Sequence, residues 1–367
     1  MPKNIDFKIL TIVGARPQFI KSATISRILN SKKYNGVEEV IVHTGQHYDD
    51  YMSGVFFREL EIPAPNYNLH VGSGSHSQQT GLMLTELEKV VEIENPNVIL
   101  VYGDTNSTLA GALVAAKKPC KLAHVEAGLR SFRKGMAEEV NRVVTDSLSD
   151  VLFCPTTLAK NNLEAEGKAE KSFLVGDVMY DSYLYYSNKV NSLKEFHGID
   201  LIKNKFILAT IHRAENTDNL ETLKIIFSSF KLISKNIRII LPLHPRTKKM
   251  VEKLGLSIDG IDIIDPVPYK TMISLLGKTS MVITDSGGLQ KEAYFAKVPC
   301  LTLRDETEWI ETLDNGWNRL LSPNSKEGIV SSVMSLLEMN FSNTIYCENY
   351  GNGKAAEKII NGILRIE

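Results

Sequence analysis

The stretch NVILVYGDTNSTLAGALVAAKKPCKLAHVEAGLRSFRKGMAEEVNR (residues 97–142) decides how this chain folds and where its chemistry lies. It holds two apolar runs, Val98 to Tyr102 and Leu122 to Val125, and each leads directly into a carboxylate beside glycine, at Asp104 and at Glu126. In an open parallel sheet, ligands bind beyond the carboxyl ends of the strands. We therefore expect both acids to face a ligand site rather than a core.

A third acidic position follows these two acids: the pair Glu138 and Glu139 begins the next helical pattern. A single acid in such a place is more often a helix cap or a turn residue. Three acids at successive strand and helix junctions of one segment favour a site instead.

Apolar runs of strand length alternate with helical patterns along the whole chain, and they form two series. The first series comprises residues 8–13, 40–43, 98–102, 122–125, 151–154 and 173–175, and the second comprises 206–211, 237–243, 261–264, 281–284 and 301–303. Such runs, separated by helices, predict parallel sheets covered on both faces. The polar and aromatic segment 177–205 has no alternating pattern, so we place a hinge there. The expected fold class is α/β, with two parallel-sheet domains, residues 1–176 and 177–367, facing a cleft.

Composition excludes several classes of function. A net charge of −1 over 367 residues provides no basic field for nucleic acid. Four cysteines without a CxxC pair argue against a zinc site and against a disulfide framework, and we expect buried thiols. Neither a signal sequence nor a run of membrane-spanning length is present in the sequence, so we expect a soluble cytoplasmic protein without a membrane partner.

The first glycine motif, VGARPQFIK (residues 13–21), combines a strand end with a helix start. Pro17 suits the first helical turn, and Arg16 and Lys21 stand near backbone amides that favour an anion. The motif is neither GxGxxG nor a Walker loop, so a nicotinamide cofactor or ATP has no support. A surface ion pair explains Arg16 equally well.

The second glycine motif, TDSGGLQKEAYF (residues 284–295), is a stronger signal. Amides of Ser286, Gly287 and Gly288 at a helix start can bind a diphosphate, and Glu292 one turn later can bind ribose hydroxyls. An ordinary capped turn is the alternative, and it needs one glycine more readily than two.

Two histidine and arginine motifs, HRAEN (residues 212–216) and HPRT (residues 244–247), end strands of the second series. His212 can serve as a general acid, and Arg213 can bind phosphate in a bidentate manner. A metal pair is the competing hypothesis, but HxH and HExxH spacings are absent and we assign no metal. His43 and His47 are interpreted as structural.

The ordered set GARPQFIK, HTGQHYD, VYGDTNSTLAGALVA, HVEAGLRSF, EEVNR, HRAEN, HPRT and TDSGGLQKEA resembles the non-hydrolysing UDP-N-acetylglucosamine 2-epimerase family across nearly the whole chain. This resemblance implies glycosyltransferase-B architecture, with two Rossmann-like domains, a last helix (about 351–367) that crosses back to the first domain, and a homodimer. It also implies inversion at C2 of a UDP-2-acetamido sugar by elimination and re-addition of UDP, without a cofactor, for cell-surface polysaccharide precursors.

The resemblance also implies roles for the residues that match the family's motifs. Asp104, Glu126 and Glu138 match its acid/base positions, and His212 is the expected acid toward the leaving phosphate. The matching substrate-binding positions are Arg16, Lys21, Ser286, Gly287, Gly288 and the ribose-binding Glu292.

The chain departs from the family's pattern at two places. Ala137 stands where proline commonly precedes the acid pair, and Trp309 stands where many members have a substrate-binding arginine. The Trp309 segment resembles the branch that epimerises UDP-2,3-diacetamido-2,3-dideoxyglucuronate, whose C6 carboxylate would need a cation such as Arg304, Arg130 or Arg133. A packing role for Trp309 is equally compatible. A hydrolysing epimerase, a glycosyltransferase of the same fold and a non-enzymatic sugar sensor remain the alternative functions.

Overall fold

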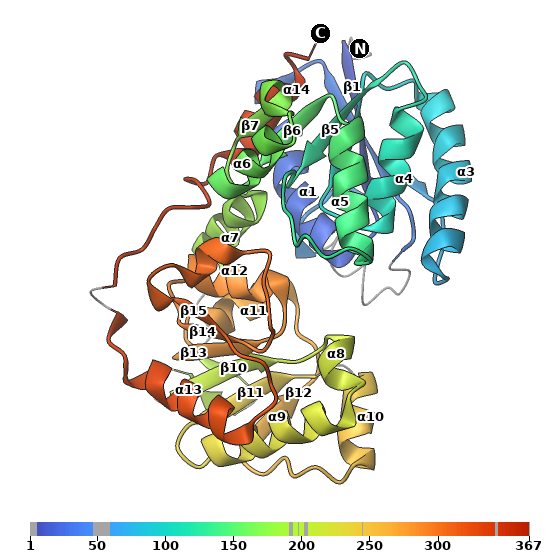
Figure 1. The fold of residues 1–367 in the computed structure, drawn as a ribbon. Helices are drawn as coiled ribbons and strands as arrows, with labels where there is room; N and C mark the ends of the chain where they lie inside the picture. Colours follow the sequence, from blue (N-terminus) through green and yellow to red (C-terminus); the bar gives the residue numbers. More distant parts are fainter. Residues whose placement is uncertain are drawn as a thin grey trace. The chain divides into compact units, whose positions relative to one another are not determined.

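The computed structural model describes residues 6–46, 59–190, 194–196, 198–201, 205–243, 245–341 and 344–366. The chain divides into two compact units, Met1–Leu184 with Glu348–Glu367, and Tyr185–Cys347 (Figure 1). The sequence placed the boundary at residue 177, whereas the division falls inside helix α7 (Val178–Lys189). Ser182 of α7 donates a hydrogen bond to the carbonyl of Ile20 at 2.9 Å, which holds the start of α7 on the first unit.

The first unit contains a parallel seven-stranded sheet in the order β3-β2-β1-β4-β5-β6-β7. Its strands are β1 (Phe7–Val13), β2 (Val37–His43), β3 (Tyr67–Asn68), β4 (Val98–Tyr102), β5 (Lys121–Val125), β6 (Val151–Cys154) and β7 (Ser172–Leu174). Its helices include α1 (Arg16–Leu29), α3 (His76–Glu94), α4 (Asn106–Ala115), α5 (Ala137–Leu148), α6 (Thr157–Ala165) and α14 (Ala355–Ile363). Helices α3, α4 and α5 lie side by side on one face, and α1 packs against α14 on the other (Figure 1).

The second unit contains a parallel six-stranded sheet in the order β12-β11-β10-β13-β14-β15. Its strands are β10 (Phe206–Thr210), β11 (Arg238–Pro242), β12 (Ile261–Ile264), β13 (Met281–Thr284), β14 (Cys300–Thr302) and β15 (Asn318–Leu320). Its helices include α8 (Ala214–Thr217), α9 (Leu220–Ile233), α10 (Pro245–Lys253), α11 (Tyr269–Leu276), α12 (Gly287–Phe295) and α13 (Lys326–Glu338). Phenylalanines and aliphatic residues of α9 and α13 form one core with the inner faces of the strands.

Both sheets have the same strand order around their first strand, which confirms the predicted pair of Rossmann-like α/β domains. The order reverses between β1 and β4 in one sheet and between β10 and β13 in the other. At such switch points the connections leave in opposite directions, so a crevice opens beyond the carboxyl ends of the strands. Asp104 follows β4 at the first of these points, Glu126 follows the neighbouring strand β5, and the second glycine motif follows β13 at the other point.

The segment 177–205, in which we placed a hinge, carries the whole of α7 and a small hairpin of β8 (Glu195–Phe196) and β9 (Ile199–Asp200). Val178, Met179 and Tyr186 of α7 are buried, and this burial explains the helix, although its aromatic composition hid the helical period. Two cysteines, Cys120 and Cys347, are half-buried rather than buried as expected.

The turn between β4 and α4 shows how the local sequence positions the site. All five residues of β4 are buried, as required of a central strand covered on both faces. Gly103 follows at φ +63°, a left-handed conformation that favours glycine. Thr105 then caps α4 by accepting a hydrogen bond from the amide of Thr108. Asp104 is therefore held between a fixed glycine turn and a capped helix start.

The C-terminal helix α14 is fastened to the first unit by a buried carboxylate. Asp181 of α7 accepts a hydrogen bond from the amide of Ala356 at 2.9 Å, at the start of α14. Burial raises the pKa of Asp181 to about 6 and outweighs the opposing hydrogen bonds from the Ala356 and Ala355 amides. The native state therefore binds this proton more tightly than the unfolded chain does.

We expect Asp181→Asn to change how stability depends on pH. In the wild type, the free energy of unfolding should fall as pH rises from about 4 to about 6, because the native state must release a tightly held proton. The neutral amide removes this cost, so the variant should be more stable than wild type by about 1 to 3 kcal/mol at pH 7.5. Urea unfolding across pH 4 to 8 measures the effect, with Glu357→Gln on α14 as the control. If the free energy of unfolding of Asp181→Asn depends on pH as that of the wild type does, the raised pKa of Asp181 is contradicted.

Candidate active site

Lys21, Glu126 and Gly103 meet at the carboxyl edge of the first sheet. The Lys21 ammonium forms an ion pair with the Glu126 carboxylate, and both side chains are at least nine-tenths buried. A Cβ atom at Gly103 would lie 3.1 Å from the lysine nitrogen and 3.2 Å from the glutamate oxygen. The structure thus brings a predicted substrate-binding cation and a predicted catalytic acid into direct contact, beside the turn that carries Asp104.

Glu126 has an unusual backbone conformation. Its φ is +72°, the left-handed region that a non-glycine residue adopts at a cost. The amides of Glu126 and Ala127 both donate to the carbonyl of Phe153 on β6, each at 3.1 Å, and these bonds fix the turn. Strain of this kind is concentrated at functional sites.

Gln18 organises the switch point of the first sheet, a role that the sequence did not reveal. Its side-chain oxygen accepts from the amides of Gly14 and Ala15 at 2.8 and 3.1 Å. Its side-chain nitrogen donates to the carbonyl of Tyr102 at 2.9 Å and to the hydroxyl of Thr108 at 3.0 Å. The two amides before α1, which we expected to be open to an anion, are therefore occupied by Gln18.

Asp104 is held by an arginine that links it to the acidic pair at the start of α5. Arg142 donates to one oxygen of Asp104 through Nε at 3.0 Å and through Nη2 at 2.6 Å. The same guanidinium donates to Glu139 at 2.9 Å. Glu138, the acid that the sequence singled out, is exposed, whereas Glu139 is buried.

Glu139 also anchors the loop that follows β5. Its carboxylate accepts from the amides of Ser131 and Phe132, both at 2.9 Å. Burial alone would raise the pKa of Glu139, but these amides and Arg142 outweigh it and lower the pKa. Glu139 is therefore an ionised structural acid, and Glu138 beside it remains the one that can reach outward.

In the second unit, Asp285 supports the His212 and Arg213 turn. This fully buried carboxylate accepts from the amides of His212 and Arg213 at 3.1 and 3.0 Å, and from the side chain of Asn216 at 3.0 Å. The His212 ring nitrogen Nδ1 lies 3.2 Å from the carboxylate, while the ring is 55% exposed. An exposed imidazole oriented by a buried acid suits proton transfer.

The second glycine motif forms the start of α12, as the sequence predicted. The Ser286 hydroxyl caps the helix by accepting from the amide of Leu289 at 3.4 Å. Gly287 and Gly288 are the first helical residues, so their amides have no acceptor within the helix. Glu292 lies on the same helix and is buried. This arrangement can bind a diphosphate at the helix start.

Trp309 is buried next to the same helix start. The Lys291 ammonium lies 3.5 Å from the centre of its ring, a close cation–π contact. The indole nitrogen would be 3.6 Å from a Cβ atom at Gly287. The side chain thus packs beneath the glycine turn, where it can influence a ligand without the donor fork of an arginine.

Several residues named in the sequence analysis lie outside the groups described above. Arg304 pairs with Glu308 at 3.1 Å, and Arg130 pairs with Asp146 at 2.7 Å, so both cations are already matched by buried carboxylates. His43 is buried and accepts from the Gly45 amide at 2.8 Å. The side chain of Arg16, together with His47 and His244, lies outside the described part of the structure.

Metal and membrane features were also considered. Among the residues that the structure describes, no group of three or more His, Cys, Asp or Glu side chains is placed to hold a metal ion. In the described ranges, the helices are all too short or too polar to cross a lipid bilayer.

The family model for UDP-N-acetylglucosamine 2-epimerase matches residues 30–364. The chain belongs to this family. A UDP-N-acetylglucosamine 2-epimerase homolog of Methanococcus maripaludis is 51% identical over 96% of this chain and 98% of its own length. A UDP-2,3-diacetamido-2,3-dideoxy-D-glucuronate 2-epimerase of Pseudomonas aeruginosa is 47% identical over 98% of this chain and all of its own.

A solved structure supports the same family assignment. The crystal structure of Methanocaldococcus jannaschii UDP-GlcNAc 2-epimerase in complex with UDP-GlcNAc and UDP superposes with a TM-score of 0.86 at 42% identity, over 97% of this chain and 99% of that one. The family resemblance read from the sequence is therefore confirmed.

We expect Arg142→Met to destabilise this epimerase-family protein strongly. Removal of one partner leaves the buried Glu139 carboxylate without its cation, which typically costs about 3 to 5 kcal/mol. Urea unfolding at pH 7.5 measures the loss. Arg142→Met combined with Glu139→Gln should recover part of it, because the second change removes the uncompensated charge; additive losses in the double variant would contradict the pairing.

Proposed function

We propose that this enzyme inverts C2 of a UDP-2-acetamido sugar, of the UDP-GlcNAc to UDP-ManNAc type, by elimination and re-addition of UDP. The observation that carries the proposal is the pair of acids at adjacent strand ends, Asp104 held by Arg142 and Glu126 held by Lys21. Inversion requires a proton to leave one face of the sugar and to return to the other, so it needs acid/base groups on both faces.

The reaction balances without a cofactor. One carboxylate takes the proton from C2 while the C1–O bond to UDP breaks, which gives UDP and a 2-acetamidoglycal. UDP then adds back to C1, and a carboxylic acid on the opposite face returns a proton to C2. We assign these roles to Asp104 and Glu126, with the exposed Glu138 as a third acid.

The second unit is proposed to hold the UDP. The amides of Gly287 and Gly288 and the hydroxyl of Ser286 would bind the diphosphate, because the Ser286 amide already donates to the Thr284 hydroxyl at 2.9 Å. Glu292 would bind the ribose hydroxyls. His212, oriented by Asp285, would protonate the departing phosphate oxygen, and Arg213 would stabilise its charge. Arg16, a substrate-binding position that the family resemblance implies, is proposed to bind the UDP sugar as well.

A second candidate substrate is UDP-2,3-diacetamido-2,3-dideoxyglucuronate. It is favoured by the Pseudomonas relative at 47% identity and by Trp309 beside the glycine turn. Arg304 and Arg130 are buried, whereas Arg133 is exposed, so we propose Arg133 as the cation for a C6 carboxylate. A hydrolysing epimerase or a glycosyltransferase has no comparable observation in its favour.

The biological setting is part of the same proposal. We infer a cytoplasmic homodimer that makes precursors of cell-surface polysaccharide, because the family resemblance implies this assembly and this pathway. Analytical ultracentrifugation of the purified chain tests the dimer directly.

We expect Asp104→Asn and Glu126→Gln each to lower turnover by about 10² to 10⁴-fold, the usual contribution of a general acid or base. UDP affinity should stay near the wild-type value, because neither Asp104 nor Glu126 is among the residues proposed to bind UDP. Steady-state kinetics and calorimetry with UDP measure the two effects. Glu94→Gln, an acid of the same unit bound to Lys8 and Tyr67, is the matched control. Near-normal turnover in either site variant would exclude its role.

We expect Trp309→Arg to shift substrate preference toward UDP-GlcNAc, because a guanidinium offers five donors where the indole offers one. The measurement compares kcat/KM for UDP-GlcNAc and for the diacetamido glucuronate in wild type and variant. A wild type that strongly prefers UDP-GlcNAc, with no shift in the variant, would leave the second candidate substrate without support.

A further inference from the structure

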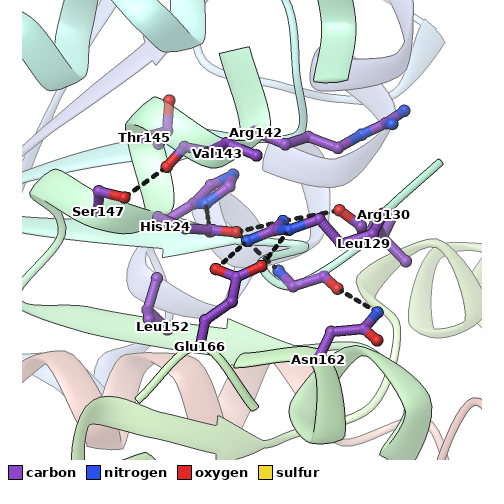
Figure 2. A network of polar contacts seen from close by, with 12 residues as sticks. His124, Leu129, Arg130, Arg142, Val143, Thr145, Ser147, Leu152, Asn162 and Glu166 are labelled. Atoms are coloured by element: carbon purple, nitrogen blue, oxygen red, sulfur yellow. Dashed lines mark hydrogen bonds and ion pairs between the residues drawn. The ribbon is translucent and has the colours of Figure 1, made fainter. Parts of the chain in front are cut away.

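A group of charged residues, all buried except Glu166, lies beneath the acid-bearing turns of the first unit, and the proposed chemistry does not use it. It consists of His124 on β5, Asp146 on α5, Arg130 after β5 and Glu166 after α6 (Figure 2). His124 and Asp146 are completely buried. Figure 2 shows the guanidinium of Arg130 and the carboxylate of Glu166 facing each other, with hydrogen bonds of 2.6 and 2.8 Å.

The geometry determines the protonation state of His124. Its Nδ1 lies 2.7 Å from a carboxylate oxygen of Asp146, and its Nε2 lies 2.8 Å from the carbonyl oxygen of Gly103. A carbonyl can only accept, so Nε2 must carry a proton. An ionised carboxylate also only accepts, so Nδ1 must carry one as well, and the ring is then an imidazolium.

Asp146 is the ionised carboxylate that accepts the Nδ1 proton of His124. Burial alone would raise the pKa of Asp146, but the hydrogen bond from His124 and the charge of Arg130 outweigh burial and lower it. The second carboxylate oxygen lies 2.7 Å from Arg130 and accepts from the amide of Gly128 at 3.2 Å. Donors thus surround the carboxylate and stabilise its ionised form.

The imidazolium connects the two turns that carry the proposed catalytic acids. Gly103, whose carbonyl it holds, immediately precedes Asp104, and the Gly103 amide donates to the carbonyl of Val125 at 2.9 Å. His124 itself stands two residues before Glu126 on β5. A single buried ring therefore fixes one acid-bearing turn relative to the other.

We propose that His124 is a positioning residue of the epimerase: an imidazolium, with a proton on each ring nitrogen, that holds the Asp104 turn in register with Glu126 and supplies positive charge beneath both carboxylates. The inference rests on the proposed function.

The other charges around the ring make its own charge necessary. Within the cluster, the cations His124 and Arg130 balance the anions Asp146 and Glu166, and Lys168 contacts Glu166 at 2.6 Å from the outer side. Across Gly103, Lys21 and Glu126 form their own pair. On β6, burial raises the pKa of the Cys154 thiol to about 12, so this neighbour is neutral. With a neutral side chain at position 124, Asp146 would lose the cation that also holds the Gly103 carbonyl, and it would share Arg130 with Glu166.

The first experiment observes the ring directly and needs no activity. Long-range ¹H–¹⁵N correlation NMR of the full chain, with the His124→Gln spectrum identifying the His124 signals, should show both ring nitrogens protonated at pH 7.5. In Asp146→Asn the ring should carry one proton fewer at the same pH, because its anionic partner is gone. A neutral His124 ring in the wild type at pH 7.5 would overturn the proposal.

The second experiment separates positioning from mere stability. In His124→Gln, kcat should fall about 10²-fold, as expected for displaced catalytic groups, while KM changes less than threefold. The acid limb of the kcat/KM profile should move to higher pH, because loss of a cation disfavours ionised carboxylates. Asp146→Asn removes an anion together with the positive charge of the ring, so its limb should move less than that of His124→Gln.

The control is Asn219→Ala, which removes the cap of α9 in the second unit, where Asn219 accepts from the amides of Glu221 and Thr222. It should lower Tm and leave the pH profile unchanged. An active wild type with an unshifted acid limb in His124→Gln would overturn the inference about His124. A wild type without epimerase activity would overturn the proposed function, and the NMR result would still decide the charge of the ring.

Discussion

Lys21 and Glu126 form a buried ion pair at the carboxyl edge of the first sheet, and the arrangement of the acid-bearing turns depends on it. The pair joins α1, which follows β1, to the turn after β5, so it spans the point where the strand order reverses. Neither charge is stable when buried alone, because an unpaired buried ion costs several kcal/mol. Gly103 packs against both atoms of the pair, and this close approach leaves no room to spare for a side chain there.

The second unit applies the same principle at its own switch point. There the fully buried Asp285 follows β13 and receives the amides of the His212 turn that follows β10. In the second unit a buried carboxylate from one strand end binds the backbone of the other, whereas in the first unit the buried ion pair joins two side chains. Two of the residues proposed to react, Asp104 and His212, remain partly exposed because buried neighbours satisfy one side of each, whereas Glu126 is buried in its pair with Lys21.

Much of the fold was predictable because apolar runs, glycines and helix caps are local signals. The run Val98 to Tyr102 became a fully buried central strand, and the Ser286 motif became a capped helix start. Gln18, Arg142 and Asp285 were not predicted as organising residues, because their roles depend on partners that are distant in sequence and on the reach of their side chains. Whether Glu138 or Glu139 is buried likewise depends on the rotation of α5 about its axis, which the sequence pattern alone does not determine.

The central claim is that the acids at the ends of β4 and β5 exchange the hydrogen at C2 of a UDP-2-acetamido sugar. Proton NMR of the purified enzyme with UDP-GlcNAc, and in parallel with the diacetamido glucuronate, in D₂O tests it most directly. The account predicts that the product isomer carries deuterium at C2, with a small amount of free UDP, because the hydrogen passes through an exchangeable carboxyl group. Interconversion with complete retention of the original hydrogen at C2 would contradict the account.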